Sequence, residues 1–412
     1  MGERELSQGA AAAYERKDHT GALSLYIHFP FCVRKCAYCD FLSAPADEET
    51  REAYVDALAR EIKTAGERIA AQQPGHVQYV DTIYFGGGTP SLMTSAQTDH
   101  LLTAVAMSFL VADDAEISAE CNPGTADQEK LAAWRSMGIN RLSIGAQSFH
   151  DDDLKRLGRI HTAAQIGQTF RAARQAGFTN ISMDLISSLP GQTTGRAKED
   201  LCSAMALMPE HLSVYSLIIE EDTPFRDMYG SRETAPDPAY LPLPDEDTER
   251  EIYHRTWQLL EEGGYRQYEI SSAARPGYEC FHNIGYWKGH EYLGFGLGAA
   301  SLYGGARWSN TPDLQEYTEA MSAVPQRDIR RELSVLTEKD RLEEFMFLGL
   351  RMTDGISEEV FAKTFGKTAD EVYGDVIRKQ TEQGMLERSG GRLFFTERGV
   401  DISNTLMAEY MF

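Results

Sequence analysis

Short apolar segments alternate with longer amphipathic segments throughout the first half of the chain. The pattern predicts strands at 24–28, 79–85, 116–121, 142–144, 180–185 and 212–219. It predicts helices between them at 48–71, 96–109, 127–137, 163–176 and 197–208. Strands that are joined by helices form parallel sheets. We therefore expect an α/β fold with a partial, TIM-like (β/α)6 barrel, and functional groups at the carboxyl ends of its strands.

The pattern changes after residue 221, because five prolines fall within 222–245 and predict an irregular connection. A helix is expected at 247–262 and a strand at 265–270. A helical unit begins at about Arg330, and 385–396 is expected to form a small β wing. We divide the chain into an N-terminal tail (1–22), a core barrel (23–221), a Pro-rich connection with an accessory α/β region (222–327) and a C-terminal helical, winged-helix-like module (328–412).

The chain is strongly acidic, with 40 Lys and Arg residues against 63 Asp and Glu residues and a formal charge of −23. Such a chain repels phosphate backbones, so nucleic-acid binding is not expected, even for the winged module. The first residues lack the apolar core of a signal peptide, and no apolar stretch approaches the ~18 residues that a spanning helix needs. We therefore expect a cytoplasmic protein.

Three of the six cysteines, Cys32, Cys36 and Cys39, fall within eight residues directly after the first predicted strand. Three thiolates on one short loop suit zinc or an iron–sulfur cluster. A closed zinc site needs a fourth ligand, which would be a distant histidine such as His28 or His161. A 4Fe–4S cluster on three thiolates instead leaves one iron open to bind a ligand.

This C-x3-C-x2-C run, with Tyr38 before its last cysteine, resembles the radical S-adenosylmethionine (SAM) superfamily. The resemblance implies a radical SAM barrel and a 4Fe–4S cluster on the three cysteines, whose open iron binds the amino and carboxylate groups of SAM. It also implies one-electron cleavage of SAM to a 5′-deoxyadenosyl radical. A zinc-stabilised interaction module is a weaker alternative, because it leaves the polar residues at the strand ends unexplained.

Glycines and polar residues follow the predicted strands at the edge where such a barrel carries its chemistry. The run Gly87-Gly88-Thr89 follows the second strand and resembles the superfamily's motif for the SAM amino group. The other candidates for the SAM site are Tyr26, Tyr38, Glu120, Gln147, Arg159 and Asp184. We expect Glu120 and Asp184 to bind amino or hydroxyl groups, and Arg159 to bind the carboxylate. Gln147 is expected at the ribose, and Tyr26 against the cluster or SAM.

Nearly the whole chain resembles oxygen-independent coproporphyrinogen III dehydrogenase and its relatives, the HemW-type heme chaperones. The dehydrogenase decarboxylates two propionates of its substrate, whereas the chaperones bind heme and deliver it. Phe41 stands where the dehydrogenase has a further cysteine, and only about twenty residues precede the first strand here, where the dehydrogenase has a longer extension. The run from His282 to Trp287 resembles the H-N-x-x-Y-W motif of the chaperones.

That motif implies His282 as a ligand of heme iron. Without the resemblance, the better interpretation of His282 is a buried histidine in an aromatic cluster. Cys121, Cys202 and Cys280 are expected to be packing residues. We expect a heme chaperone with a 4Fe–4S cluster, SAM and heme b, and the dehydrogenase is the alternative. Its expected partners are apo-hemoproteins such as respiratory-chain proteins, with peripheral contact to membrane-bound recipients and a homodimer as further options.

Overall fold

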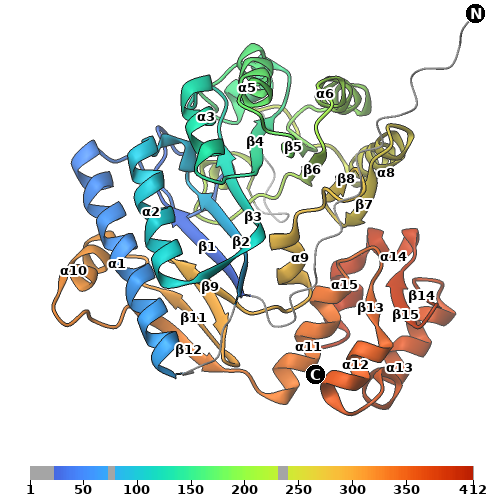
Figure 1. Ribbon diagram of the computed structural model, residues 1–412. Coiled ribbons are helices and arrows are strands. Elements are labelled where there is room, and N and C mark those ends of the chain that lie inside the picture. Colours follow the sequence, from blue (N-terminus) through green and yellow to red (C-terminus); the bar gives the residue numbers. More distant parts are fainter. Residues whose placement is uncertain (1–22, 73–78, 231–239, 412) are drawn as a thin grey trace, which may run out of the picture.

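The computed structural model describes residues 23–72, 79–230 and 240–411 (Figure 1). The expected tail at 1–22 and two of the prolines, Pro236 and Pro238, lie outside the described residues. The described chain forms a large sheet of twelve strands, with helices over its outer face and a C-terminal module beside it.

Six parallel strands lie side by side in chain order and form the centre of this sheet. They are β1 Leu23–Phe29, β2 Tyr79–Gly87, β3 Leu110–Cys121, β4 Arg141–Gln147, β5 Ile181–Ser187 and β6 His211–Ser216. Each is joined to the next by at least one helix, and the sheet is open at its ends. The expected partial (β/α)6 barrel is therefore confirmed. β3 and β4 are longer than predicted, because pairing with neighbouring strands continues beyond their apolar runs.

Most of the connecting helices cover the outer face of these strands (Figure 1). They are α1 Glu48–Gln72, α2 Ser95–Ser108, α3 Gln128–Ser136, α4 Asp151–Arg156, α5 Ala163–Gln175 and α6 Thr194–Ala206, with a short 3-10 turn, η1, at Pro90–Leu92. Local sequence sets where they begin. Thr94 and Gln97, for example, form a reciprocal capping box at the start of α2.

The two faces of the parallel strands differ in polarity. In β4, Leu142, Ile144 and Ala146 belong to the apolar core, whereas the alternate residues Arg141 and Ser143 line a cavity on the other face. This follows from the alternation of side chains along a strand. Barrels of this kind usually fill their interior with branched apolar side chains. Here polar side chains occupy the inner face and surround a cavity.

The chain after β6 adds strands to both edges of the sheet. Its elements are α7 Pro224–Tyr229, α8 Glu246–Glu262, β7 Arg266–Glu269, β8 Ser272–Ala274, α9 Phe281–Trp287, β9 Tyr292–Phe295, β10 Ala300–Tyr303, β11 Ala306–Asn310, α10 Leu314–Ser322 and β12 Arg330–Val335. β8 and β7 extend the sheet beyond β6, and β9 to β12 extend it beyond β1.

Two segments of this region differ from the expectation. The Pro-rich connection contains the helix α7, because Pro224 occupies its first turn, where a missing N–H costs nothing, and Thr223 caps it. The segment from Arg330 to Val335 pairs with β11 as the edge strand β12 and does not begin the helical unit.

The C-terminal module has an apolar core of its own. Its elements are α11 Glu338–Gly349, β13 Ile356–Ser357, α12 Glu358–Phe365, α13 Ala369–Glu382, β14 Leu386–Ser389, β15 Arg392–Phe395, α14 Glu397–Asp401 and α15 Ser403–Ala408. Its strands form a separate sheet, in which β14 and β15 are the expected wing. α11 contacts α9, the helix that carries His282. None of the described helices is long and apolar enough to cross a membrane.

Candidate functional site

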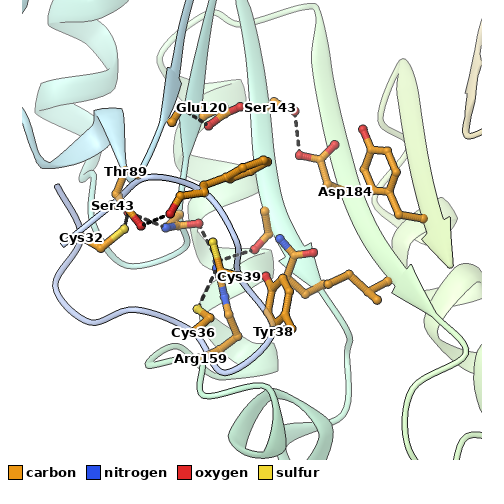
Figure 2. Close-up of a pocket in the computed structure, with 18 of the residues that line it drawn as sticks. Cys32, Cys36, Tyr38, Cys39, Ser43, Thr89, Glu120, Ser143, Arg159 and Asp184 are labelled. Atoms are coloured by element: carbon orange, nitrogen blue, oxygen red, sulfur yellow. Dashed lines mark hydrogen bonds between the residues drawn. The ribbon is translucent and has the colours of Figure 1, made fainter. Parts of the chain in front are cut away.

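A cavity of about 490 Å³ opens where the parallel strands end. Its wall combines the loop after β1 with residues from β2 to β6, and Figure 2 shows the cysteines on one side of it and Glu120, Ser143 and Asp184 on the strands. All but two of the predicted site residues line it, namely Cys32, Cys36, Tyr38, Cys39, Gly87, Gly88, Thr89, Glu120, Gln147, Arg159 and Asp184. Tyr26 and His282 do not.

The cysteine loop is tied to the rest of the barrel by backbone hydrogen bonds. The Cys32 N–H donates to the Ala44 carbonyl over 3.1 Å and joins the two ends of the loop. The Ala37 N–H donates to the Leu157 carbonyl, beyond α4, over 3.0 Å. The loop therefore has a defined path, and its three thiols are partly exposed at the cavity wall.

Two of these thiols accept hydrogen bonds from residues on neighbouring loops (Figure 2). The Thr89 hydroxyl donates to Cys32 Sγ over 3.4 Å. The Arg159 guanidinium donates to Cys36 Sγ over 3.7 Å. These donors would remain as hydrogen-bond partners of the two sulfurs when a metal binds. Burial raises the pKa of Cys39, so the binding of a metal by this thiol would release a proton.

Asn122 connects these two contacts, and the sequence analysis did not identify it. Its amide nitrogen donates to Thr89 Oγ1 over 2.9 Å, and its Oδ1 accepts from Arg159 over 2.5 Å. Asn122 therefore links the partner of Cys32 to the partner of Cys36. The available signal was its position, one residue beyond the end of β3 and two beyond Glu120.

His28 and His161, the candidates for a fourth zinc ligand, are held by other groups. The ring nitrogens of His28 are hydrogen-bonded to the Tyr26 hydroxyl at 2.9 Å and to the Leu42 carbonyl at 3.0 Å. His161 Nε2 donates to the Ala146 carbonyl over 3.2 Å. These bonds disfavour the zinc alternative. Within the described residues, no three His, Cys, Asp or Glu side chains converge as the ligands of a single ion do.

The glycine run brings the end of β2 close to β1 and the cysteine loop. A Cβ atom on Gly87, whose φ is +111°, would lie 2.6 Å from the ring of His28. A Cβ atom on Gly88 would lie 2.8 Å from the carbonyl oxygen of Phe31. The Gly87 N–H donates to the Glu120 carboxylate over 3.2 Å. These glycines are thus required by packing between protein segments, apart from any ligand.

Glu120 and Asp184 place two carboxyl groups in the cavity wall. Burial, together with the charge of Asp184, raises the pKa of Glu120 to about 8. Burial also raises the pKa of Asp184. The Tyr84 hydroxyl donates to Glu120 over 3.2 Å, and the Ser143 hydroxyl donates to Asp184 over 2.8 Å. The ionised form of a buried carboxyl group beside a second carboxylate is stabilised by a cationic or hydrogen-bond-donating ligand.

Tyr38 and Gln147 contribute to the same wall. Burial raises the pKa of the Tyr38 phenol, and Tyr38 packs against a small apolar cluster that includes Leu157 and Ile186. Gln147 ends β4 with a φ of +67°, a conformation that few residues other than glycine adopt. Backbone strain of this kind concentrates at functional sites.

Tyr26 and His282 lie beside the cavity, with their ring centroids 6.5 Å apart. His282 is buried on α9, where Nδ1 is hydrogen-bonded to Thr82 Oγ1 at 2.8 Å and Nε2 to the Tyr286 hydroxyl at 2.9 Å. Burial, together with the charge of Arg141, lowers the pKa of His282 to about 3. The imidazole is therefore neutral, as an iron ligand must be, but both of its nitrogens have partners.

The remaining cysteines have different environments. Cys121 and Cys280 are buried, as expected of packing residues, although Cys121 also reaches the cavity wall. Burial raises the pKa of Cys121 to about 11 and that of Cys280 to about 12, so both remain thiols. The expectation that Cys202 is a packing residue is wrong, because its side chain is exposed on α6.

Two family models match the chain. The model of the radical SAM superfamily matches residues 26–201, which include the cysteine loop and the wall residues from Cys32 to Asp184. The model of the HemN C-terminal domain matches residues 336–402, which begin just before α11.

Curated proteins match over nearly the full length. Heme chaperone HemW of Lactococcus lactis is 34% identical, and the match covers 94% of this chain and 97% of the relative. Heme chaperone HemW of Escherichia coli is 35% identical, with 94% and 98% covered. A mitochondrial radical S-adenosyl methionine domain-containing protein 1 of Danio rerio is 30% identical, with 93% and 84% covered.

Among solved structures, coproporphyrinogen III oxidase (HemN) from Escherichia coli superimposes with a TM-score of 0.79 over 95% of this chain and 90% of that chain. The two sequences are 23% identical. This likeness establishes the fold, and it covers both the barrel and the C-terminal module.

Proposed function

Because this chain belongs to the HemW family of radical SAM proteins, we propose that it is a heme chaperone, which binds heme b and transfers it to apo-hemoproteins. The observation that carries the proposal is the 34–35% identity, over 94% of the chain, to proteins named heme chaperone HemW. The dehydrogenase alternative has weaker support, because the likeness to HemN is one of fold at 23% identity.

We assign the 4Fe–4S cluster of the radical SAM family to Cys32, Cys36 and Cys39. Three observations support this assignment: the thiols share one loop, they face one cavity, and two of them accept hydrogen bonds from Thr89 and Arg159. When bound, the cluster and SAM together supply one-electron chemistry. The protein's own contribution is to hold the thiolates and to leave the cavity side of the loop open.

SAM is assigned to the cavity beside the cysteines. Its amino group suits Glu120, because its N–H groups can donate to the carboxylate, and these hydrogen bonds would lower the pKa of about 8 so that the carboxyl group releases a proton. Its carboxylate suits Arg159, which is already directed at Cys36. Asp184 and Gln147 line the part of the wall that would face the ribose.

Heme is assigned to His282 and to the adjacent deep end of the cavity, where Asn283, the next residue on α9, lines the wall. For Nε2 of His282 to bind iron, the hydrogen bond to Tyr286 must open. The mouth of the cavity offers an apolar surface through which a porphyrin would enter. Exposed apolar side chains line the cavity there, namely Val33, Phe41, Ile160 and Ile218.

We further propose that the protein acts in the cytoplasm, serves recipients such as respiratory-chain proteins by peripheral contact at the membrane, and forms a homodimer. The six free cysteines suit a reducing compartment. The apolar mouth is a surface through which a recipient or a second copy can make contact. Light scattering with and without the cluster tests the dimer.

The chaperone proposal is tested with the full chain, reconstituted anaerobically with iron and sulfide. Titration with heme, followed by its absorbance, should reach one heme per chain, and the loaded protein should transfer heme to an apocytochrome. The same preparation is then incubated with coproporphyrinogen III, SAM and a reductant. Absence of heme binding would overturn the proposal, and formation of protoporphyrinogen over many turnovers would establish the dehydrogenase instead.

A further inference from the structure

Arg141 is a buried cation in the wall of the barrel cavity, outside the set of residues assigned above. It opens β4, its side chain is 2% exposed, and it lines the same cavity as the cysteine loop. Arg159 donates to Gly145, four residues further along β4. Since a strand rises about 3.3 Å per residue, Arg141 lies roughly 13 Å deeper along β4 than Gly145.

The guanidinium of Arg141 has no partner within the described residues. Its Nε is buried without a hydrogen bond, and no hydrogen bond or ion pair reaches its other nitrogens there. Arg159 differs, since it donates to Cys36, Asn122 and Gly145. The neighbouring Ser118 on β3, paired with Arg141 in register, also has a buried hydroxyl that finds no partner in the part of the chain that the structure describes.

The two carboxyl groups that act electrostatically on Arg141, those of Glu116 and Asp184, are bound to other donors. Glu116 accepts hydrogen bonds from the backbone N–H groups of Phe281 and His282, at 3.4 and 3.2 Å. Asp184 accepts from Ser143, at 2.8 Å, and from Ser182. These carboxyl groups attract Arg141 through space, but they do not contact its guanidinium.

A buried charge is costly unless a counter-ion and hydrogen bonds compensate for its lost hydration. A guanidinium is a planar fork of donors that matches a carboxylate in two parallel hydrogen bonds. The surrounding wall adds further polar groups from Tyr84, Ser213 and Asn283. An anionic group that enters this end of the cavity would therefore meet a ready, unpaired partner.

We propose that Arg141 anchors a carboxylate of the ligand that occupies the cavity beyond SAM, at the end away from the cysteine loop. This inference rests on the proposed function, under which the carboxylate is a propionate of heme. It deepens that function by giving the propionate a specific counter-ion in a chain whose overall charge of −23 repels anions.

The test compares heme with heme dimethyl ester, whose propionates are blocked, on the reconstituted full chain with SAM. Wild type should bind heme roughly 10- to 100-fold more tightly than the ester, because a hydrogen-bonded charge pair contributes that much. Arg141→Gln should lose this preference while it keeps its affinity for the ester, and Arg141→Lys should restore part of it. Arg171→Gln, which changes an exposed arginine on α5, is the matched control and should behave as wild type.

The other outcomes separate this inference from the proposed function. An unchanged preference in Arg141→Gln overturns the anchor and leaves the chaperone intact. Weaker SAM binding with an unchanged preference assigns Arg141 to SAM and likewise overturns it. If wild type binds no heme, the chaperone proposal fails, and the binding experiment is repeated with coproporphyrin III and its tetramethyl ester in place of heme and its ester. A preference for coproporphyrin III over the ester that is lost in Arg141→Gln would still support Arg141 as the carboxylate anchor. No such preference would overturn the anchor as well.

Discussion

The cysteine loop and the α9 helix both carry residues that the sequence predicts as iron ligands, but the structure presents them in opposite ways. The thiols of the loop are partly exposed at a cavity wall. The imidazole of His282 is buried, with a hydroxyl on each nitrogen. The contrast teaches that a ligand's chemistry can be inferred from its type and spacing, whereas its availability depends on the hydrogen bonds that the fold has already given it.

The two regions therefore differ in what binding requires. The backbone hydrogen bonds of the cysteine loop do not involve its thiols, so the proposed cluster would require none of them to break. His282 must first give up a hydrogen bond to Thr82 or Tyr286, which costs about 1–3 kcal/mol when the partner stays buried. Apparent heme affinity through His282 would be lowered in proportion to the small fraction of molecules in which one of these hydrogen bonds is open.

The largest expected effect is the loss of iron when the cysteine loop is changed. Replacement of Cys32, Cys36 and Cys39 by Ala should lower the iron content after reconstitution from about four per chain to nearly zero. Cys202→Ala, which changes an exposed cysteine far from the loop in sequence, should retain all of the iron. Iron and sulfide analysis provides the measurement. Full iron in the triple variant would show that the ligands lie elsewhere.

On the α9 side, His282→Ala should destabilise the protein by about 3 kcal/mol, because it leaves a small void and two buried hydroxyls without partners. The cysteine variant should keep the stability of the cluster-free wild type. Denaturant unfolding of cluster-free protein measures both. Equal stability losses in the two variants would contradict the contrast between the regions.

The same histidine should make stability depend on pH. Its pKa is about 3 in the folded protein and about 6.5 when unfolded, so the unfolded state binds more protons between these values. Wild-type stability should therefore fall as pH decreases from about 6.5, and the fall should be shallower in His282→Ala.

Tyr286→Phe, which keeps the imidazole but frees Nε2, should bind heme more tightly than wild type if His282 is a heme ligand.

In the cavity beside the cysteine loop, Glu120 should have a smaller effect, on the pH dependence of SAM binding. Since the amino group of bound SAM favours the ionised form of Glu120, this residue should make SAM affinity rise with pH, by at most about tenfold per unit, until the rise levels off above its pKa of about 8. Glu120→Gln should bind SAM more weakly and with a shallower profile, which retains only the titration of the SAM α-amino group itself. Calorimetric titrations between pH 6.5 and 8.5 test this, and an equally steep profile in the variant would assign the titration to another group.

The smallest effect is expected for Asn122→Ala. The loss of hydrogen bonds to Thr89 and Arg159 should loosen both partners of the cysteines and weaken SAM binding about fivefold, equivalent to ~1 kcal/mol. The iron content should be unchanged. A loss of iron would mean that Asn122 supports the cluster thiolates directly.

Most of the cavity wall is predictable from the sequence, because parallel strands bring their carboxyl ends together whatever their spacing along the chain. That rule placed Glu120, Gln147 and Asp184 at one rim without knowledge of any contact. It could not identify Asn122, because an asparagine after a strand is usually a cap or turn residue. It also missed Arg141, which lies at the beginning of β4 and reaches the cavity from the opposite end.

The sequence by itself determined the order of strands and helices and the chemistry of the cysteine loop, because periodicity and ligand spacing are local properties of the chain. Only the tertiary structure decided which predicted ligands are available. Hydrogen bonds between residues about 200 positions apart, such as Thr82 and His282, hold one candidate inside the barrel. The absence of such bonds at Arg141, among the residues described, leaves a buried cation facing the cavity. Contacts of this kind arise when the sheet curves around its polar inner face, and the pattern along the chain does not contain them.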